Sequence, residues 1–443
     1  MSPGPVIPVI GGGLAGVEAA YQIVKAGCRV RLIEMRPTAT TEAHTTPHLG
    51  EMVCSNSLGS TELSSAAGLL KEELRRLDSF FLRLAEQARV PAGQSLSVDR
   101  LRLAASLDRE LARLPGVEIE RREVTRLAEF LDAGGPVIIA SGPLTSPALA
   151  AAISEITLRR NLFFFDATSP LIHKDSIDLG RVFPASRYGK GEADFINIPL
   201  TREEYDQLVV DLTTAETVET PDFEKNLFFE ACLPVEEIAR RGPQSLAFGP
   251  LKPVGLIDPR TGRQPHAVVQ LRQEDVEGRF YQLVGFQTRL KYGEQKRVFS
   301  RLPGLEKVEF ERYGRMHRNT YLNGPLILDA LYRSKTRPTL FFAGQISGVE
   351  GYVESVSSGL VAGFTAARMA LGQPVIEFPP ETALGALARH IATSSWKDFK
   401  PSKFTFGLLP AAGLSNRNKK LKKEAQATRA LERLSAWNER PSS

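Results

Sequence analysis

Apolar and polar positions along the first part of the chain predict a strand–helix–strand unit. Residues 6–10 form a short apolar run typical of a buried strand, and residues 17–25 place small and apolar side chains at helical spacing. Gly27 ends this helix, and residues 29–33 alternate between polar and apolar side chains, as a second strand does. The pattern therefore predicts a βαβ unit.

The same periodicities predict further elements along the chain. Apolar runs bounded by turn residues predict buried strands at 137–140, 162–165 and 339–343. Helical spacing predicts helices over 60–89, 97–114 and 355–370, and a mostly helical end over 381–437. Residues 166–323 keep no βαβ rhythm, because Pro, Gly, aromatic and charged residues mix there. We expect a separate α+β domain in that stretch.

The turn after the first strand carries the first candidate chemistry. Gly11, Gly13 and Gly16 fit the spacing G-x-G-x-x-G, which allows a tight turn, close approach of a pyrophosphate and close packing of helix on strand. The free N–H groups of the following helix then face the phosphates. Glu34 ends the second strand, where the ribose of a dinucleotide needs a hydrogen-bond acceptor. We expect a dinucleotide to contact Gly11, Gly13, Leu14, Ala15, Gly16 and Glu34.

A second glycine-rich segment, far down the chain, helps to choose between FAD and NAD. The strand predicted at 339–343 runs into Gly344 and Gln345, and Gly351 and Tyr352 follow before the next helix. This arrangement resembles the C-terminal flavin-contacting segment of FAD enzymes of the glutathione-reductase type. One FAD site split by an insertion therefore fits better than an NAD dehydrogenase. We expect Gly344, Gln345, Gly351 and Tyr352 to contact the FAD.

The predicted fold class is α/β, an FAD-binding Rossmann-like domain of the glutathione-reductase type with an inserted α+β domain. We place the FAD-binding domain at residues 1–165 and 324–443, and the inserted substrate domain at 166–323. The 443 residues suffice for two or three domains. With 42% hydrophobic and 24% charged residues, the composition excludes a disordered or collagen-like chain. The net charge of +5 is a weak sign of an anionic partner.

The chain has three cysteines, Cys28, Cys54 and Cys232, and none of them is spaced for a metal site or a disulfide framework. This sparse use and the lack of a basic leader favour a reducing, cytoplasmic location. Cys28 lies in the nucleotide unit and is expected in the core. Cys54 and Cys232 are either reactive thiols or small buried apolar residues. Beside a flavin, two thiols suit a redox disulfide or, because they are far apart in sequence, covalent addition to C6 of a pyrimidine.

Several motifs together resemble one family. They lie at residues 9–16, 53–58, 232–236, 248–256, 314–320, 343–345 and 351–352. The chain resembles the folate- and FAD-dependent tRNA (uracil-5-)-methyltransferases over nearly its whole length. Larger flavoenzymes that carboxymethylaminomethylate wobble uridines share the N-terminal flavin unit but carry an extra C-terminal domain. Only residues 374–443 follow Gln373 here, which disfavours that relationship.

The resemblance implies a reaction. FAD, reduced by NADPH or NADH, takes a methylene group from 5,10-methylenetetrahydrofolate and leaves tetrahydrofolate. The group passes to C5 of the T-loop uridine of tRNA, and a flavin hydride completes the methyl. Cys232 matches the family's candidate C6 nucleophile, and Cys54 matches the cysteine near flavin N5, a candidate for proton transfer or for holding a flavin-linked intermediate. The division between the two thiols and the oligomeric state stay open, and a plain FAD oxidoreductase is the alternative.

Basic residues are candidates for RNA contact, because a T-loop uridine must leave its stack to reach a flavin and tRNA is held largely through its backbone. The first group is a run near the C-terminus, Arg417, Lys419, Lys420, Lys422 and Lys423. The second lies in the insert and consists of Arg312, Arg315, His317 and Arg318. Either group is alternatively a solvated face or a set of structural ion pairs. His317 and Arg318 are also candidates for contact with folate glutamate or flavin.

Overall fold

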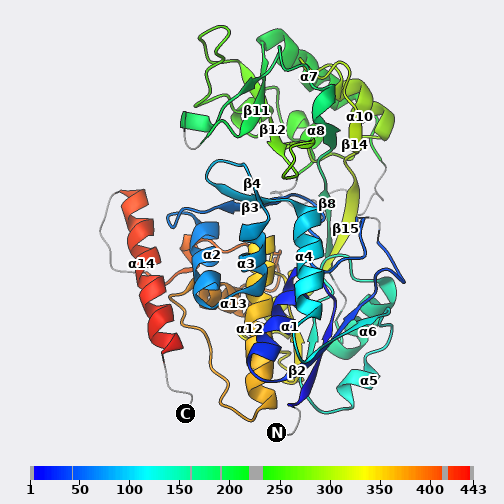
Figure 1. The fold of residues 1–443 in the computed structure, drawn as a ribbon, viewed down its shortest axis with the longest axis vertical. Coiled ribbons are helices and arrows are strands. Elements are labelled where there is room, and N and C mark those ends of the chain that lie inside the picture. The colour runs from blue at the N-terminus through cyan, green and yellow to red at the C-terminus, as the bar shows by residue number, and fades with distance from the viewer. Residues whose placement is uncertain are drawn as a thin grey trace.

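The structure is a computed structural model that describes residues 4–41, 43–159, 162–189, 192–218, 233–411 and 418–439. Figure 1 shows two lobes stacked along the long axis of the molecule. A parallel five-stranded sheet lies in the lower lobe, in the order β16-β7-β1-β2-β6. Its strands are β1 (Val6–Ile10), β2 (Arg29–Glu34), β6 (Val117–Arg121), β7 (Val137–Ile139) and β16 (Leu340–Phe342). Four of them confirm strands predicted from the sequence, and the α/β fold class is confirmed.

Two helices pack closely against each other beside this sheet. They are α1 (Leu14–Lys25) and α12 (Tyr352–Ala370), and both begin earlier than the predicted starts at 17 and 355. A Cβ atom at Gly359 would stand 2.2 Å from the carbonyl oxygen of Ala15, which shows how closely the two backbones approach. This contact fixes the N-terminal ends of both helices relative to the sheet.

The predicted helix over 60–89 is wrong as a single element. It is divided into α2 (Ala66–Arg76) and α3 (Phe80–Gln87), because Asp78 adopts a φ of 58° and the Ser79 hydroxyl accepts a hydrogen bond from the first turn of α3. The predicted helix over 97–114 begins only at Arg100, as α4 (Arg100–Ala112), and Asp99 caps it. The residues around these helices form a small antiparallel sheet of β3 (Ser57–Ser60), β4 (Arg89–Val90) and β5 (Ser95–Val98).

The upper lobe is built from a six-stranded sheet in the order β10-β11-β12-β13-β9-β14, in which every neighbouring pair is antiparallel. Its strands are β9 (Leu171–His173), β10 (Phe183–Pro184), β11 (Phe195–Leu200), β12 (Ala267–Gln273), β13 (Phe280–Leu283) and β14 (Phe310–Arg312). The helices packed with it are α7 (Arg202–Thr214), α8 (Val235–Arg240), α9 (Ser245–Phe248) and α10 (Tyr292–Phe299). The lobe has its own hydrophobic core, formed by residues between Ile172 and Val308.

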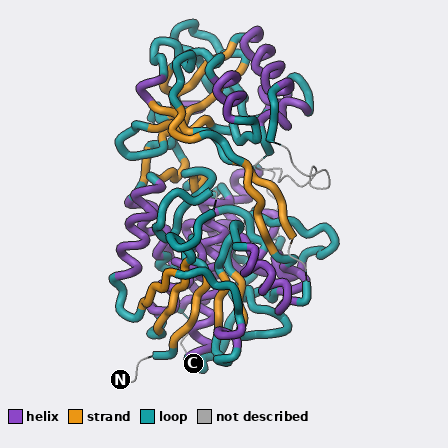
Figure 2. Tube along the Cα trace, turned by 90° about the vertical axis from the view of Figure 1, so that its right-hand side faces the viewer, coloured by secondary structure: helices purple, strands orange, loops and turns teal. Residues whose placement is uncertain are grey.

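The core of the lower lobe draws its residues from before Phe165 and after Asn319, on both sides of the insert. A two-stranded antiparallel ribbon joins the lobes, formed by β8 (Leu162–Ala167) and β15 (Met316–Tyr321). Figure 2 shows this ribbon running from one lobe into the other. β8 confirms the strand predicted at 162–165, whereas β15 was not predicted. The domain limits given above stay a prediction.

The C-terminal part is less helical than predicted. α13 (Ala383–Thr393) and α14 (Lys419–Asn438) are separated by a stretch that includes Pro401 and Pro410, residues that cannot continue a helix. In α14 the Trp437 ring stacks on Phe378 with centroids 4.1 Å apart. The remaining helices of the lower lobe are α5 (Ala128–Leu131), α6 (Pro147–Thr157) and α11 (Gly324–Ile327). In the part of the chain that the structure describes, no helix is long and apolar enough to cross a bilayer.

Candidate functional site

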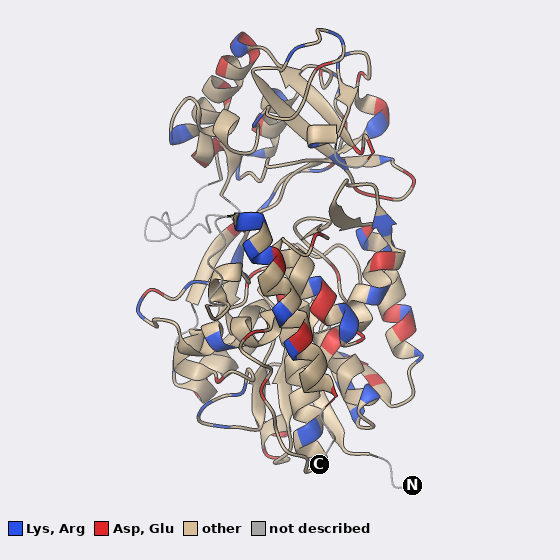
Figure 3. Cartoon of the chain, turned by 90° about the vertical axis from the view of Figure 1, so that its left-hand side faces the viewer, with Lys and Arg blue, Asp and Glu red and all other residues tan. Residues whose placement is uncertain are grey.

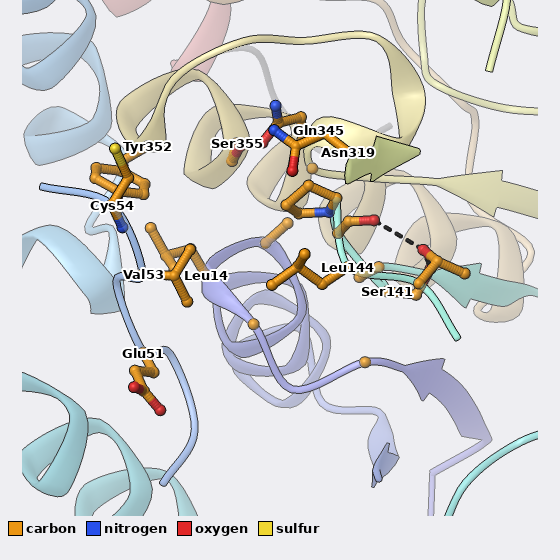
Figure 4. A pocket seen from close by; sticks show the side chains of 18 of the residues that line it. Leu14, Glu51, Val53, Cys54, Ser141, Leu144, Asn319, Gln345, Tyr352 and Ser355 are labelled. Carbon is orange, nitrogen blue, oxygen red and sulfur yellow. Dashed lines mark hydrogen bonds between the residues drawn. The ribbon is translucent and has the colours of Figure 1, made fainter. Parts of the chain in front are cut away.

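A long cavity of about 450 Å³ runs through the lower lobe to the junction with the upper one. The glycine-rich turn and the end of β2 line one part of it. The segment around Cys54, the ribbon and the turn before α12 line the other part. Figure 4 shows side chains of both parts facing a common space. Segments that are far apart in the sequence thus share one site.

The glycine turn presents the N-terminus of α1 to the cavity. Gly11, Gly13, Leu14 and Ala15 line it, as predicted for a phosphate contact, and the N-cap residue Gly13 makes no side-chain cap. A Cβ atom at Gly13 would meet no protein atom within 4 Å, so the space in front of it is open. The first N–H groups of α1 are therefore accessible to a phosphate.

Gly16 does not line the cavity. A Cβ atom there would lie 1.8 Å from the carbonyl oxygen of Gly11, so a side chain at this position would push α1 away from the turn. Gly16 acts through packing, which is the role expected of the third glycine in the fingerprint. Its predicted contact with the cofactor has no support from the shape of the cavity.

Glu34 lies at the end of β2 and lines the cavity, as predicted. Its carboxylate accepts hydrogen bonds from the Gly12 N–H (2.8 Å), and from the Arg36 N–H (3.0 Å) and Nε (2.9 Å). Burial would raise the pKa of Glu34, but the hydrogen bonds and charge of Arg36 and the backbone N–H of Gly12 outweigh it, so the pKa lies below its usual value. Arg36 also pairs with the buried Glu51 at 3.0 Å. Glu34 is thus a fixed, ionised acceptor.

The second glycine-rich segment closes the opposite end of the cavity. Gly344, Gln345, Gly351 and Tyr352 all line it, as predicted. Gly344 and Gly351 have φ values of 79° and 103°, in a region that favours glycine. Gly351 is the N-cap of α12 and leaves the helix without a side-chain cap. The cavity therefore receives two helix N-termini, each able to face negative charge.

Cys54 lies beside Tyr352 at this end of the cavity (Figure 4). The backbone N–H groups of Cys54 and Ser55 donate to the Tyr352 hydroxyl oxygen, at 2.8 and 3.1 Å. The Cys54 thiol lies 3.8 Å from the Ala167 carbonyl oxygen. Burial, with the charge of Asp166, raises the pKa of the Cys54 thiol well above its usual value, so the group is a neutral thiol at pH 7.

The upper lobe holds the segment around Cys54 in place. The Gln282 side chain donates to the Cys54 carbonyl oxygen at 3.2 Å, and Arg272 Nη2 donates to the Ser55 hydroxyl at 2.8 Å. Asn56 Nδ2 donates in turn to a backbone carbonyl of β12 at 2.9 Å. Cys54 therefore lies where the two lobes meet, at the end of the cavity.

Sequence reasoning missed part of the cavity wall. The ribbon turns Asp166, His317 and Asn319 inward, all of them buried and lining the cavity. His317 Nε2 lies 3.8 Å from Asp166 Oδ2, and within the described chain Asn319 Oδ1 has no hydrogen-bond partner. Glu350 is buried beside them and accepts from Gln345 Nε2 at 2.8 Å, and burial raises its pKa to about 8. The signal was the alternation of 316–321, which places polar side chains on the buried face.

Cys232, the second predicted catalytic thiol, lies outside the described residues, and so does Arg417. After that gap, the Val235 N–H donates to the Gln287 carbonyl oxygen at 2.7 Å. Gln287 lines the cavity, so the described chain next to α8 is fixed at the cavity wall.

The predicted basic run lies at the start of α14. Lys419, Lys420, Lys422 and Lys423 are all exposed there. Lys420 Nζ lies 3.8 Å from a Glu424 oxygen, and Lys423 Nζ lies 5.7 Å from the centre of the Phe406 ring. Figure 3 shows this blue end of α14 near the junction with the upper lobe.

The second predicted basic group does not act as one surface. Arg315 and Arg318 are exposed, and the Arg318 guanidinium lies 3.7 Å from the centre of the Phe163 ring. His317 points the other way, into the cavity. Arg312 lies apart from the others, with part of its guanidinium buried. Of this group, only Arg315 and Arg318 are placed to meet RNA phosphates.

The residues present fit FAD. The cavity is long, it has an open approach at Gly13 to the N-terminus of α1, and it has an ionised acceptor at Glu34. Its far end brings the uncapped start of α12 next to Cys54. Among the described residues, no group of three or more His, Cys, Asp or Glu side chains is arranged to hold a metal ion.

Comparison with known proteins agrees with this geometry. A family model described as "Glucose inhibited division protein A" matches residues 6–374. Two solved structures of GidA from Aquifex aeolicus share the fold, with TM-scores of 0.70 and 0.67 and sequence identities of 17% and 16%. The chain aligns over 98% and 97% of its length with these, but covers only 73% and 76% of theirs.

Closer relatives match over the full length. A protein of Brevibacillus brevis is 52% identical over 428 residues, which is 97% of each chain. A protein of Bacillus subtilis is 51% identical, over 96% of this chain and 97% of its own. Both are named methylenetetrahydrofolate–tRNA-(uracil-5-)-methyltransferase TrmFO. The chain therefore belongs to the methylenetetrahydrofolate–tRNA-(uracil-5-)-methyltransferases, within the broader glucose inhibited division protein A family.

Proposed function

We propose that the protein transfers the methylene group of 5,10-methylenetetrahydrofolate to C5 of the T-loop uridine in tRNA and reduces it to a methyl group with FAD. The observation that carries this proposal is the single cavity that leads from the phosphate-binding turn at Gly13 to the thiol of Cys54 at the lobe junction. A flavin nucleotide needs the first part, and one-carbon transfer to a base needs the second. About half of all positions are identical to relatives that carry the name of this activity.

In this proposal, the chain binds FAD at both helix N-termini. Gly13, Leu14 and Ala15 receive the pyrophosphate, and Glu34 accepts a ribose hydroxyl. The turn at Gly344–Gln345 and the start of α12 at Tyr352 hold the flavin ring. Bound FAD supplies the hydride that completes the methyl group, and it is recharged by NADPH or NADH.

The two thiols take different roles. Because Cys54 is a buried neutral thiol held by Tyr352, it suits proton transfer or retention of the one-carbon unit at the flavin better than attack as a thiolate. We assign the attack on C6 of uracil to Cys232, which matches the nucleophile position of the family. Attack at C6 makes C5 nucleophilic toward the methylene group.

The tRNA is held outside the cavity, with its target base turned inward. Lys419, Lys420, Lys422 and Lys423 crowd positive charge at the N-terminus of α14, which is already the positive end of the helix dipole. That arrangement is unfavourable in the free protein and favourable when phosphates lie nearby. Since tRNA and nicotinamide cofactors meet in the cytoplasm, we place the activity there.

The test is methyl transfer from labelled 5,10-methylenetetrahydrofolate to an unmodified tRNA transcript. Cys232→Ala is expected to abolish transfer while the purified protein stays yellow, because the attack on uracil is lost and the FAD site is intact. Cys28→Ala is the matched control, since Cys28 is buried in the core away from the cavity, and it is expected to keep both properties. Near-normal transfer by Cys232→Ala would refute its role. A wild-type protein that oxidises NADPH without any tRNA product would refute the proposed function.

A further inference from the structure

Three arginines converge around the Cys54 end of the cavity. The positive charges of Arg100, Arg272 and Arg312 all act on Cys54, although they come from α4, β12 and β14. Glu274 is the carboxylate that faces all three, and Asp166 also acts on the thiol. Burying so much positive charge is costly unless each guanidinium has partners.

Two of the three arginines have such partners. Arg100 forms a buried ion pair with Glu274, and its Nη1 donates to the Met52 carbonyl oxygen at 3.0 Å. Arg272 Nη2 donates to the Ser55 hydroxyl and to the side-chain oxygen of Gln282. Both side chains therefore serve to join the two lobes around the segment of Cys54.

Arg312 is different. Its Nε and Nη2 atoms are buried and have no hydrogen-bond partner in the described part of the chain. The side chain faces a small space lined by Val53, Thr168 and His317, among others, and Val53 and His317 also line the main cavity. Burial and the charge of Arg100 lower the pKa of Arg312 to about 10, which still leaves it protonated at neutral pH. A permanent cation thus stands next to the reaction space with two donors unused.

The proposed reaction needs such a donor. When a thiolate adds to C6 of uracil, the S–C6 bond forms and the C5=C6 electron pair moves toward C4, so that negative charge develops on O4 as an enolate. When C5 then takes up the methylene carbon, the C4=O4 double bond forms again and the charge is discharged. A fixed cationic donor at O4 lowers the barrier to the first step, because it is placed where charge appears.

We propose that Arg312 is a catalytic residue that donates hydrogen bonds from Nε and Nη2 to O4 of the flipped uracil and stabilises this enolate. The two nitrogen atoms lie on the same edge of the guanidinium, which suits one oxygen with two lone pairs. The proposal rests on the proposed function and deepens it, since it assigns a residue to the charge that the transfer creates. It also explains why Arg312 keeps two donors without a protein partner.

The test uses the full-length FAD enzyme and tRNA that contains 5-fluorouridine. Fluorine at C5 cannot leave as a proton does, so the thioether at C6 persists and the covalent protein–tRNA complex is counted on a denaturing gel. Arg312→Gln is expected to slow formation of this complex by about 100-fold or more, and methyl transfer by a similar factor, with flavin absorbance and tRNA affinity kept. Arg312→Lys is expected to recover part of the rate. Arg263→Gln, an exposed arginine of the upper lobe, is the control and should behave as wild type.

Each other result contradicts the proposal in a recognisable way. If Arg312→Gln forms the complex at the wild-type rate, Arg312 does not stabilise the enolate. If it raises the KM for the folate and leaves kcat unchanged, Arg312 binds a folate carboxylate instead. If both Arg312 variants lose flavin, the side chain is structural. If wild type itself forms no complex and transfers no methyl group, the proposed function fails first and the Arg312 proposal falls with it.

Discussion

Gly13 shows how much one missing side chain decides at this site. It has an ordinary φ of −74°, so its backbone does not require glycine. What requires glycine is the open space in front of it, where a side chain would stand between the cavity and the N-terminus of α1. The same argument separates Gly13 from Gly16, whose missing side chain serves only the packing of α1 on the turn.

This difference gives a prediction. Gly13→Glu is expected to fold and to lose bound FAD, with flavin absorbance per protein reduced at least about tenfold, because a carboxylate would occupy the phosphate position and repel it. Gly135→Glu is the matched control, since Gly135 is exposed and also has open space around it. An absorbance scan of the two purified proteins decides the matter. Normal flavin content in Gly13→Glu would place the pyrophosphate elsewhere.

At the scale of single residues, the sequence identifies those that act through local geometry. The glycine turn, Glu34, Cys54 and the segment from Gly344 to Tyr352 are all predicted from sequence patterns and all lie at the cavity, apart from Gly16. The sequence could not identify Asp166 and Asn319, or the pair of Arg36 with Glu51. Charged and polar side chains usually mark the surface, and only the fold shows that these are buried.

At the scale of elements, the helices of the lower lobe are joined through buried carboxylates. Glu73 of α2 accepts from the Ala383 and Leu384 N–H groups, at 2.6 and 2.9 Å, and so caps the start of α13. Burial raises the pKa of Glu73 to about 8. The folded protein therefore keeps a proton on this carboxyl group at pH values where the unfolded chain has released it.

The pH dependence of stability follows from that shift. Between pH 4.5, the ordinary value, and about 8, the folded state binds more protons than the unfolded state, so the free energy of unfolding is expected to fall as the pH rises. Outside this window Glu73 adds no slope. Glu73→Gln is expected to remove this part of the slope in urea unfolding measured at several pH values. Glu110→Gln, on the surface of α4, is the control. An unchanged slope in Glu73→Gln would show that Glu73 is ionised throughout.

Local patterns also explain which elements were predictable. Short apolar strands at 6–10, 29–33 and 339–343 are bounded by glycine and are buried on both faces, so their signal is strong. The break between α2 and α3 depends on a left-handed Asp78 and a cap at Ser79, which do not interrupt the apolar spacing of 60–89. β15 was missed because its buried face carries His317 and Asn319, which the pattern of a hydrophobic strand does not include.

At the scale of the whole molecule, the basic end of α14 is set against the junction of the lobes (Figure 3). Replacing Lys419, Lys420, Lys422 and Lys423 with Gln is expected to weaken tRNA binding and to flatten its salt dependence. The slope of log K against log salt should fall by about 0.7–0.9 for each phosphate that the variant no longer neutralises. Filter binding over a range of salt concentrations measures this.

The control for this prediction is Arg113→Gln. Arg113 ends α4, one helix length from Arg100, which contacts the upper lobe, and so it lies away from the junction. It is expected to leave both affinity and slope unchanged. Equal slopes for wild type and the fourfold lysine variant would show that tRNA docks elsewhere, even if methyl transfer itself is intact.

The ribbon of β8 and β15 has a consequence for how this architecture tolerates change. Because the chain leaves the lower lobe on one strand and returns on its hydrogen-bonded neighbour, the upper lobe amounts to an enlarged hairpin tip. A graft at such a place changes the length of a loop without altering the order of the parallel strands beneath it. Lobes of different size and specificity are thus exchangeable on one nucleotide-binding base, provided that the incoming piece starts and ends side by side.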